Sequence, residues 1–375
     1  MSVEIESLSA FRRVVAGRKD LDGLVFQGVD LREDGRVLRG LSAQGACFLG
    51  CTLDAQTKAH ILSTGGLIFP ALPDVPYAPY RPSLYTPEGL SEGYRKGEPS
   101  SLADSLDQRV YAHFDAMRRR PGNLPILEAL AQRIHDHAID DALYDYLGST
   151  PAKKVVAVMG GHSMSRTDDA YRRVAQIALR LTALDEGYVL ATGGGPGAME
   201  AANLGAYLAP HGEGAIDVAL DLMRSAPSYK DALWWDTALD VRQRFADGGE
   251  SLGIPTWHYG HEPPNLFASH VAKYFANSIR EEGLLAIAHH GVIYAPGSAG
   301  TIQEVFMDAA QNHYASFGAR SPMVFLDRAY WTEVKPIYSV VRQLATGQGY
   351  DELMTLVDDV ESVVSFIRHH PPIPA

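Results

Sequence analysis

The sequence of 375 residues is 46% hydrophobic and 21% charged, which is ordinary for a folded globular protein with one large domain or two smaller ones. Its 45 acidic side chains outnumber 33 basic ones, and the net charge of −12 argues against broad binding to a nucleic-acid backbone while leaving small anions possible. Because no apolar run approaches the ~20 residues of a membrane span and the first residues lack a secretory signal, we expect a cytoplasmic protein with neither a nucleic-acid nor a membrane partner.

Residues 1–150 are predicted to form an N-terminal extension. Up to residue 69, short apolar pieces broken by glycine and aspartate favour short strands and turns, and "LSAQGACFLGCTL" has a hint of a five-residue rhythm that is too short to define a repeat. Residues 70–87 carry six prolines and must be extended, either as a strap over the protein's own fold, which we favour, or as a ligand for a partner domain. Two helical patterns follow, at 101–120 and 124–148.

The only two cysteines of the chain are Cys47 and Cys51. Since no second Cys/His pair stands at zinc spacing, we expect two packed thiols and no metal site.

From residue 151 to residue 375 the sequence alternates between apolar runs and amphipathic segments. Continuous apolar runs, each followed by a helix, are typical of parallel strands covered on both faces. We therefore predict an α/β domain with a doubly wound, Rossmann-like parallel sheet, whose ligands bind beyond the carboxyl ends of the strands. In chain order the expected elements are the strand "KKVVAVMGG", the helix "DDAYRRVAQIALRLTALDEG", the strand "YVLATGGG", the helix "AMEAANLGAYLAP", the segment "AIDVALDL", a helix near 265–282, the strand "GVIYAP", the helix "TIQEVFMDAAQNHY" and a last strand, "SPMVFL".

Three glycine-rich loops should meet at one edge of this sheet, because every strand-to-helix loop of a parallel sheet opens on the same side. They are "GGHSMSR" (160–166), "TGGGPGAME" (192–200) and "APGSAGTIQE" (295–304). None of them fits the dinucleotide fingerprint well, and the lysine of a P-loop is missing. The sequence thus predicts a nucleotide site that is not a standard NAD or ATP site.

The third loop has the residues best suited to chemistry. Gly297 and Gly300 leave backbone N–H groups bare, and Thr301 supplies a hydroxyl at the helix start, so together they can cradle one phosphate. Glu304 stands close to one helical turn further on, and its carboxylate can reach back toward the loop. The alternative is a capping box, in which Thr301 and Glu304 only satisfy the donors of the helix end.

Taken together, "GGHS", "GGGPGAMEAANLGA", "PPNLF" and "PGSAGTIQE" resemble the LOG-type phosphoribohydrolases, and most closely the bacterial pyrimidine/purine nucleoside 5′-monophosphate nucleosidases. The resemblance covers roughly residues 153–327. It implies hydrolysis of the N-glycosidic bond of a nucleoside monophosphate, with release of the free base and ribose 5-phosphate, and it implies no cofactor and no metal. Members are often labelled lysine decarboxylases, but no pattern in this chain argues for a pyridoxal phosphate site.

The resemblance also implies roles for single residues. Glu304 acts at the ribose as a catalytic residue, and Arg280 on the preceding helix completes the pair, while the threonine loop holds the 5′-phosphate. The family usually has two adjacent glycines after the proline, whereas this chain has Gly297 and Ser298, which puts affinity in doubt. The expected phosphate- and nucleotide-binding residues are Gly161, His162 and Ser163 in the first loop, Gly193, Gly194, Gly195, Gly197, Met199 and Glu200 in the second, and Gly297, Ser298, Gly300 and Thr301 in the third.

The family usually completes its site between subunits, so we expect a homo-oligomer, a dimer or larger. The two N-terminal helices and the C-terminal "DELMTLVDDVESVVSFIRHH" offer apolar faces for such contact. The alternative to an enzyme is a nucleotide-sensing protein with the same sheet and no turnover. The acidic balance disfavours a third possibility, a nucleotide-dependent DNA-handling protein.

Overall fold

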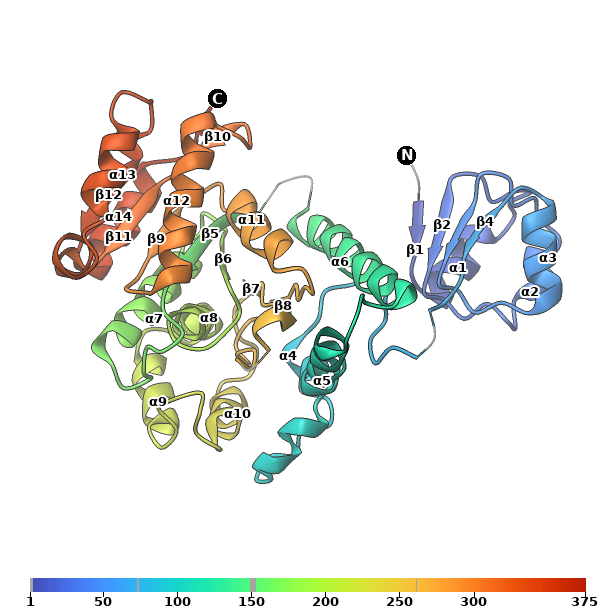
Figure 1. Ribbon diagram of the computed structural model, residues 1–375, viewed down its shortest axis with the longest axis horizontal. Helices are drawn as coiled ribbons and strands as arrows, with labels where there is room; N and C mark the ends of the chain where they lie inside the picture. Colours follow the sequence, from blue (N-terminus) through green and yellow to red (C-terminus); the bar gives the residue numbers. More distant parts are fainter. Residues whose placement is uncertain (1–2, 73, 149–152, 261) are drawn as a thin grey trace. The chain divides into compact units, whose positions relative to one another are not determined.

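A computed structural model describes residues 3–72, 74–148, 153–260 and 262–375 (Figure 1). The chain forms two compact units, of which one comprises Met1–Leu84 and Ala112–Tyr146 and the other Tyr85–Tyr111 and Leu147–Ala375. The expected boundary between residues 150 and 151 lies outside the described residues. The division also differs from a single boundary, because Tyr85–Tyr111 belongs with the C-terminal unit.

The C-terminal unit is built on a seven-stranded, wholly parallel sheet in the order β12-β11-β9-β5-β6-β7-β8. The chain begins at the central β5, proceeds outward to β8, and then returns to the other side of β5 as β9. This confirms the doubly wound, Rossmann-like α/β fold and places the reversal of strand order between β5 and β9. The strands are β5 (Lys154–Met159), β6 (Tyr188–Thr192), β7 (Ser251–Gly253), β8 (His270–Val271), β9 (Val292–Tyr294), β11 (Met323–Leu326) and β12 (Met354–Val357).

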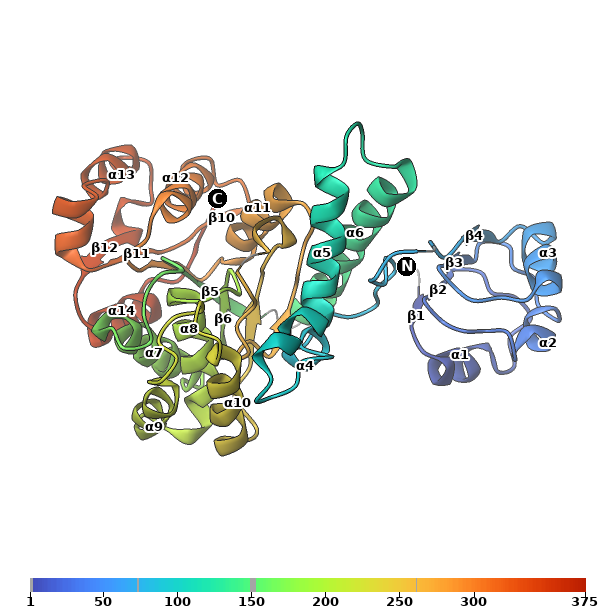
Figure 2. The same ribbon diagram turned by 60° about the horizontal axis from the view of Figure 1, so that its bottom comes forward.

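Helices cover both faces of this sheet (Figure 2). On one face α7, α8 and α14 share a buried apolar cluster with alternate side chains of the strands, among them Val156, Leu190 and Val324. The other face is covered by α11, α12 and α13. The helices of this unit are α4 (Pro87–Leu90), α7 (Asp169–Thr182), α8 (Ala198–Leu208), α9 (Gly214–Met223), α10 (Trp234–Arg244), α11 (Asn277–Ile287), α12 (Ala299–Tyr314), α13 (Tyr338–Ala345) and α14 (Val360–His369), and a short antiparallel pair joins β10 (Ala319–Arg320) to β13 (Ile373–Pro374).

Three expectations for this unit were wrong. The helix near 265–282 begins only at Asn277, because the residues before it form β8 and the connections around it. "SPMVFL" is not the last strand, since β12 pairs beside it. The C-terminal segment does not offer a free apolar face, because Val363, Val364 and Ile367 of α14 are buried against the sheet and α7. "AIDVALDL" forms helix α9.

The N-terminal unit contains a four-stranded parallel sheet in the order β1 (Val3–Ile5), β2 (Leu24–Gln27), β3 (Cys47–Leu49) and β4 (Leu67–Phe69). Val25 lies opposite Cys47, 22 positions further on, and the bridge between Asp30 and Thr52 keeps the same offset. The segments "GLVFQGVDL" and "GACFLGCTL" are therefore equivalent turns of a structural repeat, with Phe26 stacked on Phe48 in its core. The sequence rhythm alone did not reveal this period.

The remaining elements of the N-terminal part are helical. They are α1 (Leu8–Val15), α2 (Gly35–Leu38), α3 (Ala55–Ser63), α5 (Leu106–Arg119) and α6 (Ile126–Leu147), and the first residues of α5 belong to the other unit. The proline-rich stretch packs on the protein itself, as the strap interpretation predicts: Tyr80 leaves no room for a side chain at Gly50, and Tyr85 pairs with Val271 at the edge of β8.

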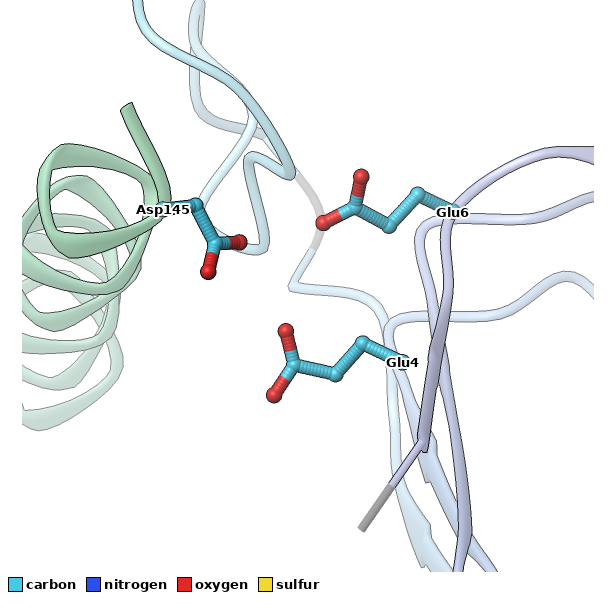
Figure 3. A group of neighbouring side chains, drawn as sticks. All are labelled: Glu4, Glu6 and Asp145. Atoms are coloured by element: carbon cyan, nitrogen blue, oxygen red, sulfur yellow. The ribbon is translucent and has the colours of Figure 1, made fainter. Parts of the chain in front are cut away.

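Glu4, Glu6 and Asp145 of the N-terminal unit point their carboxylates toward one another (Figure 3), with oxygen atoms within 4.8 Å. Partial burial, followed by repulsion from Asp141 and Asp145, raises the pKa of Glu4. Partial burial, followed by repulsion from Asp145, Glu4 and Asp141, raises the pKa of Glu6. All three side chains are exposed. Exposed carboxylates repel one another at this distance with or without a bound ion, so their proximity and raised pKa values do not by themselves indicate a metal site.

The two cysteines form no disulfide. Burial raises the pKa of the Cys51 thiol to about 11, so this side chain is a packed neutral thiol, as expected. Among the described residues, none of the helices has the length and apolar character needed to cross a membrane.

Candidate functional site

The three glycine loops meet at the carboxyl edge of the sheet, where the strand order reverses. The Gly161 N–H donates to the Pro296 carbonyl at 3.0 Å, which joins the first loop to the third. The Ala198 N–H donates to the Gly161 carbonyl at 3.1 Å, which joins the second loop to the first. Gly197 has φ +70°, and a Cβ there would lie 2.3 Å from the Gly161 oxygen, so glycine is required where these loops touch.

The third loop leads directly into the N-terminus of α12. Ser298 is the N-cap residue, and its side chain makes no capping bond to the N–H groups of the first turn. Since the helix begins at Ala299, Thr301 is the third helical residue and cannot form a capping box with Glu304, which excludes that alternative. The first-turn N–H groups and the positive end of the 16-residue helix are thus available to an anion.

Within this loop, Gly297 and Thr301 lie in direct contact. A Cβ at Gly297 would be 2.2 Å from the Thr301 Oγ1 and 3.0 Å from the Gly161 N, so no larger residue fits. Ser298 and Gly300 are exposed, and nothing lies within 4 Å of a Cβ built at Gly300. Ser298 therefore does not crowd the loop from within, although its side chain stands at the open edge.

Arg280 and Glu304 face each other beside these loops. Helix α11 supplies Arg280 and helix α12 supplies Glu304, and the Arg280 Nη1 lies 3.9 Å from the Glu304 Oε1. Both side chains are largely buried, with exposed fractions of 12% and 13%. The Arg280 Nε donates to the Ile254 carbonyl beyond β7 at 2.8 Å, and a Cβ at Gly193 would lie 2.2 Å from the Arg280 Nη2. The bare glycine thus lets the guanidinium lie against the second loop.

The environment of Glu304 disfavours its charged form. Burial raises its pKa to about 7, with Arg280 opposing the shift and Glu281 adding to it. A carboxylate that titrates near neutral pH beside a fixed cation is typical of catalytic sites. Glu304 can therefore exchange a proton, or supply negative charge to a neighbouring cationic centre, at neutral pH.

Below Glu304, a buried hydrogen-bond network fixes helix α12 to strand β9. The Tyr294 hydroxyl donates to the Asp308 Oδ2 at 2.6 Å, and the Asn312 Nδ2 donates to the Asp308 Oδ1 at 3.1 Å. Burial raises the pKa of Asp308 to about 7, against the effect of the tyrosine hydroxyl. Asp308 lies one turn beyond Glu304 on α12. The network therefore fixes the axial position and the rotation of α12, and with them the position of Glu304.

The second loop is shaped by side chains of the connection between β7 and β8. Gly194 has φ +71°, and its carbonyl accepts the Asn265 N–H at 2.9 Å, while the Asn265 Nδ2 donates to the Gly195 carbonyl at 3.1 Å. The Met199 sulfur lies 2.7 Å from a Cβ built at Gly193, and its methyl lies 3.0 Å from one at Gly195. Met199 therefore packs along the glycines, next to Arg280, where it can line a ligand.

Glu200 is placed differently from what the sequence suggested. Its carboxylate accepts the Arg166 Nε at 2.9 Å, the Arg166 Nη2 at 2.5 Å and the Tyr171 hydroxyl at 3.0 Å. The exposed fractions of Glu200 and Arg166 are 1% and 2%. The side chain holds α8 to the segment before α7 and is fully engaged there, so we leave it out of the candidate ligand site.

The first loop brings His162 and Ser163 to the surface of the site, where both are exposed. The His162 Nδ1 lies 3.4 Å from the Glu262 Oε1, and the imidazole packs edge-on against Tyr229. Sequence reasoning missed Glu262, whose Oε2 is 3.8 Å from a Cβ built at Gly195. The sequence signal for Glu262 was its position directly before "PPNLF". Two successive prolines restrict the backbone conformation of the residues beside them.

No protein-family model matches this chain, and neither does any curated protein. Among solved structures, it is similar to the molybdenum cofactor binding protein from the phototrophic bacterium Rippkaea orientalis, with 16% identity and a TM-score of 0.37 over 59% of this chain and 98% of that one. It is also similar to the Moco carrier protein from Chlamydomonas reinhardtii, with 16% identity and a TM-score of 0.37 over 58% and 96% of the two chains. Likeness at this level carries no argument about ligand or activity.

Proposed function

We propose that the chain is a phosphoribohydrolase of the LOG type, which hydrolyses the N-glycosidic bond of nucleoside 5′-monophosphates to free base and ribose 5-phosphate. The observation that carries the proposal is the pairing of Arg280 with Glu304, 3.9 Å apart, beside three glycine loops at the point where the strand order reverses. Ligands of doubly wound sheets bind at this point.

The phosphate end of the substrate is assigned to the third loop. The first-turn N–H groups of α12, the Thr301 hydroxyl and the close approach allowed by Gly297 suit a dianionic group. Binding energy from this remote group can orient the ribose for reaction, and it then contributes to turnover as well as to affinity.

The reacting end is assigned to Glu304 and Arg280. Cleavage of a ribosyl C–N bond builds positive charge on C1′ and O4′ while the base leaves with the bonding electrons. The Glu304 carboxylate stabilises that cation or orients the attacking water, as carboxylates do at oxocarbenium-like transition states. A guanidinium group does not release a proton at neutral pH and is no general acid, so the role assigned to Arg280 is to position the phosphate or ribose and to stabilise developing negative charge.

The test is a substrate comparison with purified full-length protein. We expect AMP to release adenine, while adenosine, which lacks the phosphate anchor, is cleaved at least about tenfold less efficiently in kcat/KM. Base release is measured by chromatography, and UMP with uridine, CMP with cytidine and GMP with guanosine extend the panel. Equal rates on a monophosphate and its nucleoside would contradict the proposal, and nucleotide binding without any base release would favour the non-catalytic sensor.

The proposed role of Glu304 also predicts a pH dependence. Because the ionised carboxylate is required and its pKa is about 7, kcat/KM should fall as the pH drops through neutrality. The Glu281 charge raises that pKa, so Glu281→Gln should shift the acid limb of the profile to lower pH. Glu282→Gln, at an exposed position of the same helix, is the matched control and should leave the limb in place. An unmoved limb in Glu281→Gln would show that the Glu281 charge does not act on the titrating group, and a wild-type kcat/KM that does not fall below neutral pH would remove the ionised Glu304 carboxylate from the mechanism.

A further inference from the structure

The peptide between Gly297 and Ser298 lies inside the proposed phosphate loop, and its carbonyl accepts a hydrogen bond from the Tyr330 hydroxyl. We propose that Tyr330 is a positioning residue of this site, which fixes the peptide so that the Ser298 N–H faces the phosphate. The inference rests on the proposed function, and it adds a residue from the segment after β11, which none of the three glycine loops contains.

Two successive carbonyls of the loop are held in this way. The Pro296 oxygen accepts the Gly161 N–H at 3.0 Å, and the Gly297 oxygen accepts the Tyr330 hydroxyl. In a planar trans peptide the N–H points away from the carbonyl, so these bonds turn the N–H groups of Gly297 and Ser298 away from Gly161 and Tyr330. Successive N–H groups before a helix N-terminus form a concave site for anions.

The backbone conformation at Asp327 places Tyr330 beside the phosphate loop. Asp327 directly follows β11 and has φ +83°, a left-handed conformation that is unfavourable for a non-glycine residue. It is held there because its N–H donates to the Val357 carbonyl at 2.9 Å and its Oδ1 accepts the Tyr330 N–H at 3.0 Å. Such strain persists where the surrounding structure requires it, often at ligand sites.

Trp331 anchors the same turn from the other side. Its side chain is fully buried, and its Nε1 donates to the Leu326 carbonyl at 2.9 Å and to the Tyr294 carbonyl at 3.2 Å. Those carbonyls stand at the carboxyl ends of β11 and β9, so the segment is fixed to two strands. The turn itself, Tyr330–Val334, is π-helical, a conformation that is frequent at functional sites.

A merely structural tyrosine and a positioning tyrosine predict different results. In the first case the loss of the hydroxyl lowers only the stability of the fold. In the second it frees the peptide to rotate, and the affinity for the anion falls while the fold is retained. The two effects are measured separately, as a melting temperature and as a dissociation constant.

The experiment is calorimetric titration of the full-length protein with inorganic phosphate and, separately, with AMP. Tyr330→Phe should weaken phosphate binding by about fivefold or more, the scale of one hydrogen bond, and should lower kcat/KM for monophosphates while the melting temperature changes little. Tyr314→Phe, an exposed tyrosine at the end of α12, makes the same chemical change away from the loop and should bind like the wild type.

Ser298→Pro tests the same N–H directly, because proline has no backbone N–H and the substitution removes the group. It should bind phosphate more weakly than Ser298→Ala, and adding Tyr330→Phe to Ser298→Pro should cost less than a further twofold, because both changes remove one contact. Equal binding by Ser298→Pro and Ser298→Ala, wild-type affinity in Tyr330→Phe, or multiplying effects in the double variant would overturn the inference alone. A wild-type protein that binds neither phosphate nor AMP would reject the proposed function itself.

Discussion

Glu304→Gln should lower the turnover of nucleoside monophosphates by about 100-fold or more, the scale expected when a key electrostatic contact with the transition state is removed. Binding of the monophosphate should change little, because the N–H groups of α12 and the Thr301 hydroxyl remain. Glutamine has nearly the shape of glutamate and removes a carboxylate whose ionisation burial opposes, so the fold should be retained. Base release, AMP affinity and melting temperature are measured for both proteins.

One control variant accompanies this comparison. Glu282→Gln removes a negative charge from an exposed position on α11 and should leave turnover unchanged, which excludes an effect of net charge. An unchanged rate in well-folded Glu304→Gln would remove the residue from the mechanism. If the wild type itself releases no base from any monophosphate, the interpretation of this site as a non-catalytic nucleotide sensor is favoured over that of an enzyme.

Arg166→Ala should reduce the free energy of unfolding of the C-terminal unit by about 3–5 kcal/mol, as expected when one partner of a buried ion pair is removed. The Glu200 carboxylate would keep only the Tyr171 hydroxyl and would remain as an uncompensated buried charge. The carbonyls of Ala226 and Trp234 would lose their Arg166 donor as well.

Urea unfolding followed by tryptophan fluorescence measures this loss in the relevant unit, because all four tryptophans belong to it. Arg224→Ala is the matched control: it breaks an exposed pair with Asp221 and should cost no more than about 1 kcal/mol. A loss in Arg166→Ala no larger than in Arg224→Ala would show that the buried pair is not required. Base release per folded molecule would then decide whether Glu200 acts on the ligand after all.

Helices and strands with a long, local hydrophobic pattern could be predicted from the sequence alone. The apolar run of β5 and the amphipathic helix α7 each encode their own conformation, and the glycine loops reveal where a strand ends and a helix begins. Strands β7 and β8 escaped prediction because their residues, Ser-Leu-Gly and His-Val, form no continuous apolar run, unlike those of the equally short β9. Their extended conformation depends on pairing with neighbouring strands, which is a tertiary property.

The same division holds for the candidate site. From the sequence came the residue types of the third loop, the choice of Glu304, and Arg280 through the family resemblance. The helix start at Ala299, which excludes the capping box, was decided by how the loop is held against Gly161. Likewise, Arg166 takes the carboxylate of Glu200 away from the ligand edge, and no local pattern in the second loop predicts it.

The sequence by itself therefore determined the fold class, the three loops and the chemistry that they can support, because strand, turn and helix signals are short-range. Arg280 and Glu304 were expected as a pair through the family resemblance, whereas only the tertiary structure decided that Glu262 meets His162 and that Tyr330 meets the Gly297 carbonyl. The physical reason is that partners on different elements are set by strand order and crossover packing, and these depend on the burial of the whole sheet. The equivalence of β2 and β3 in the N-terminal unit, 22 residues apart, became visible for the same reason, through pairing in register.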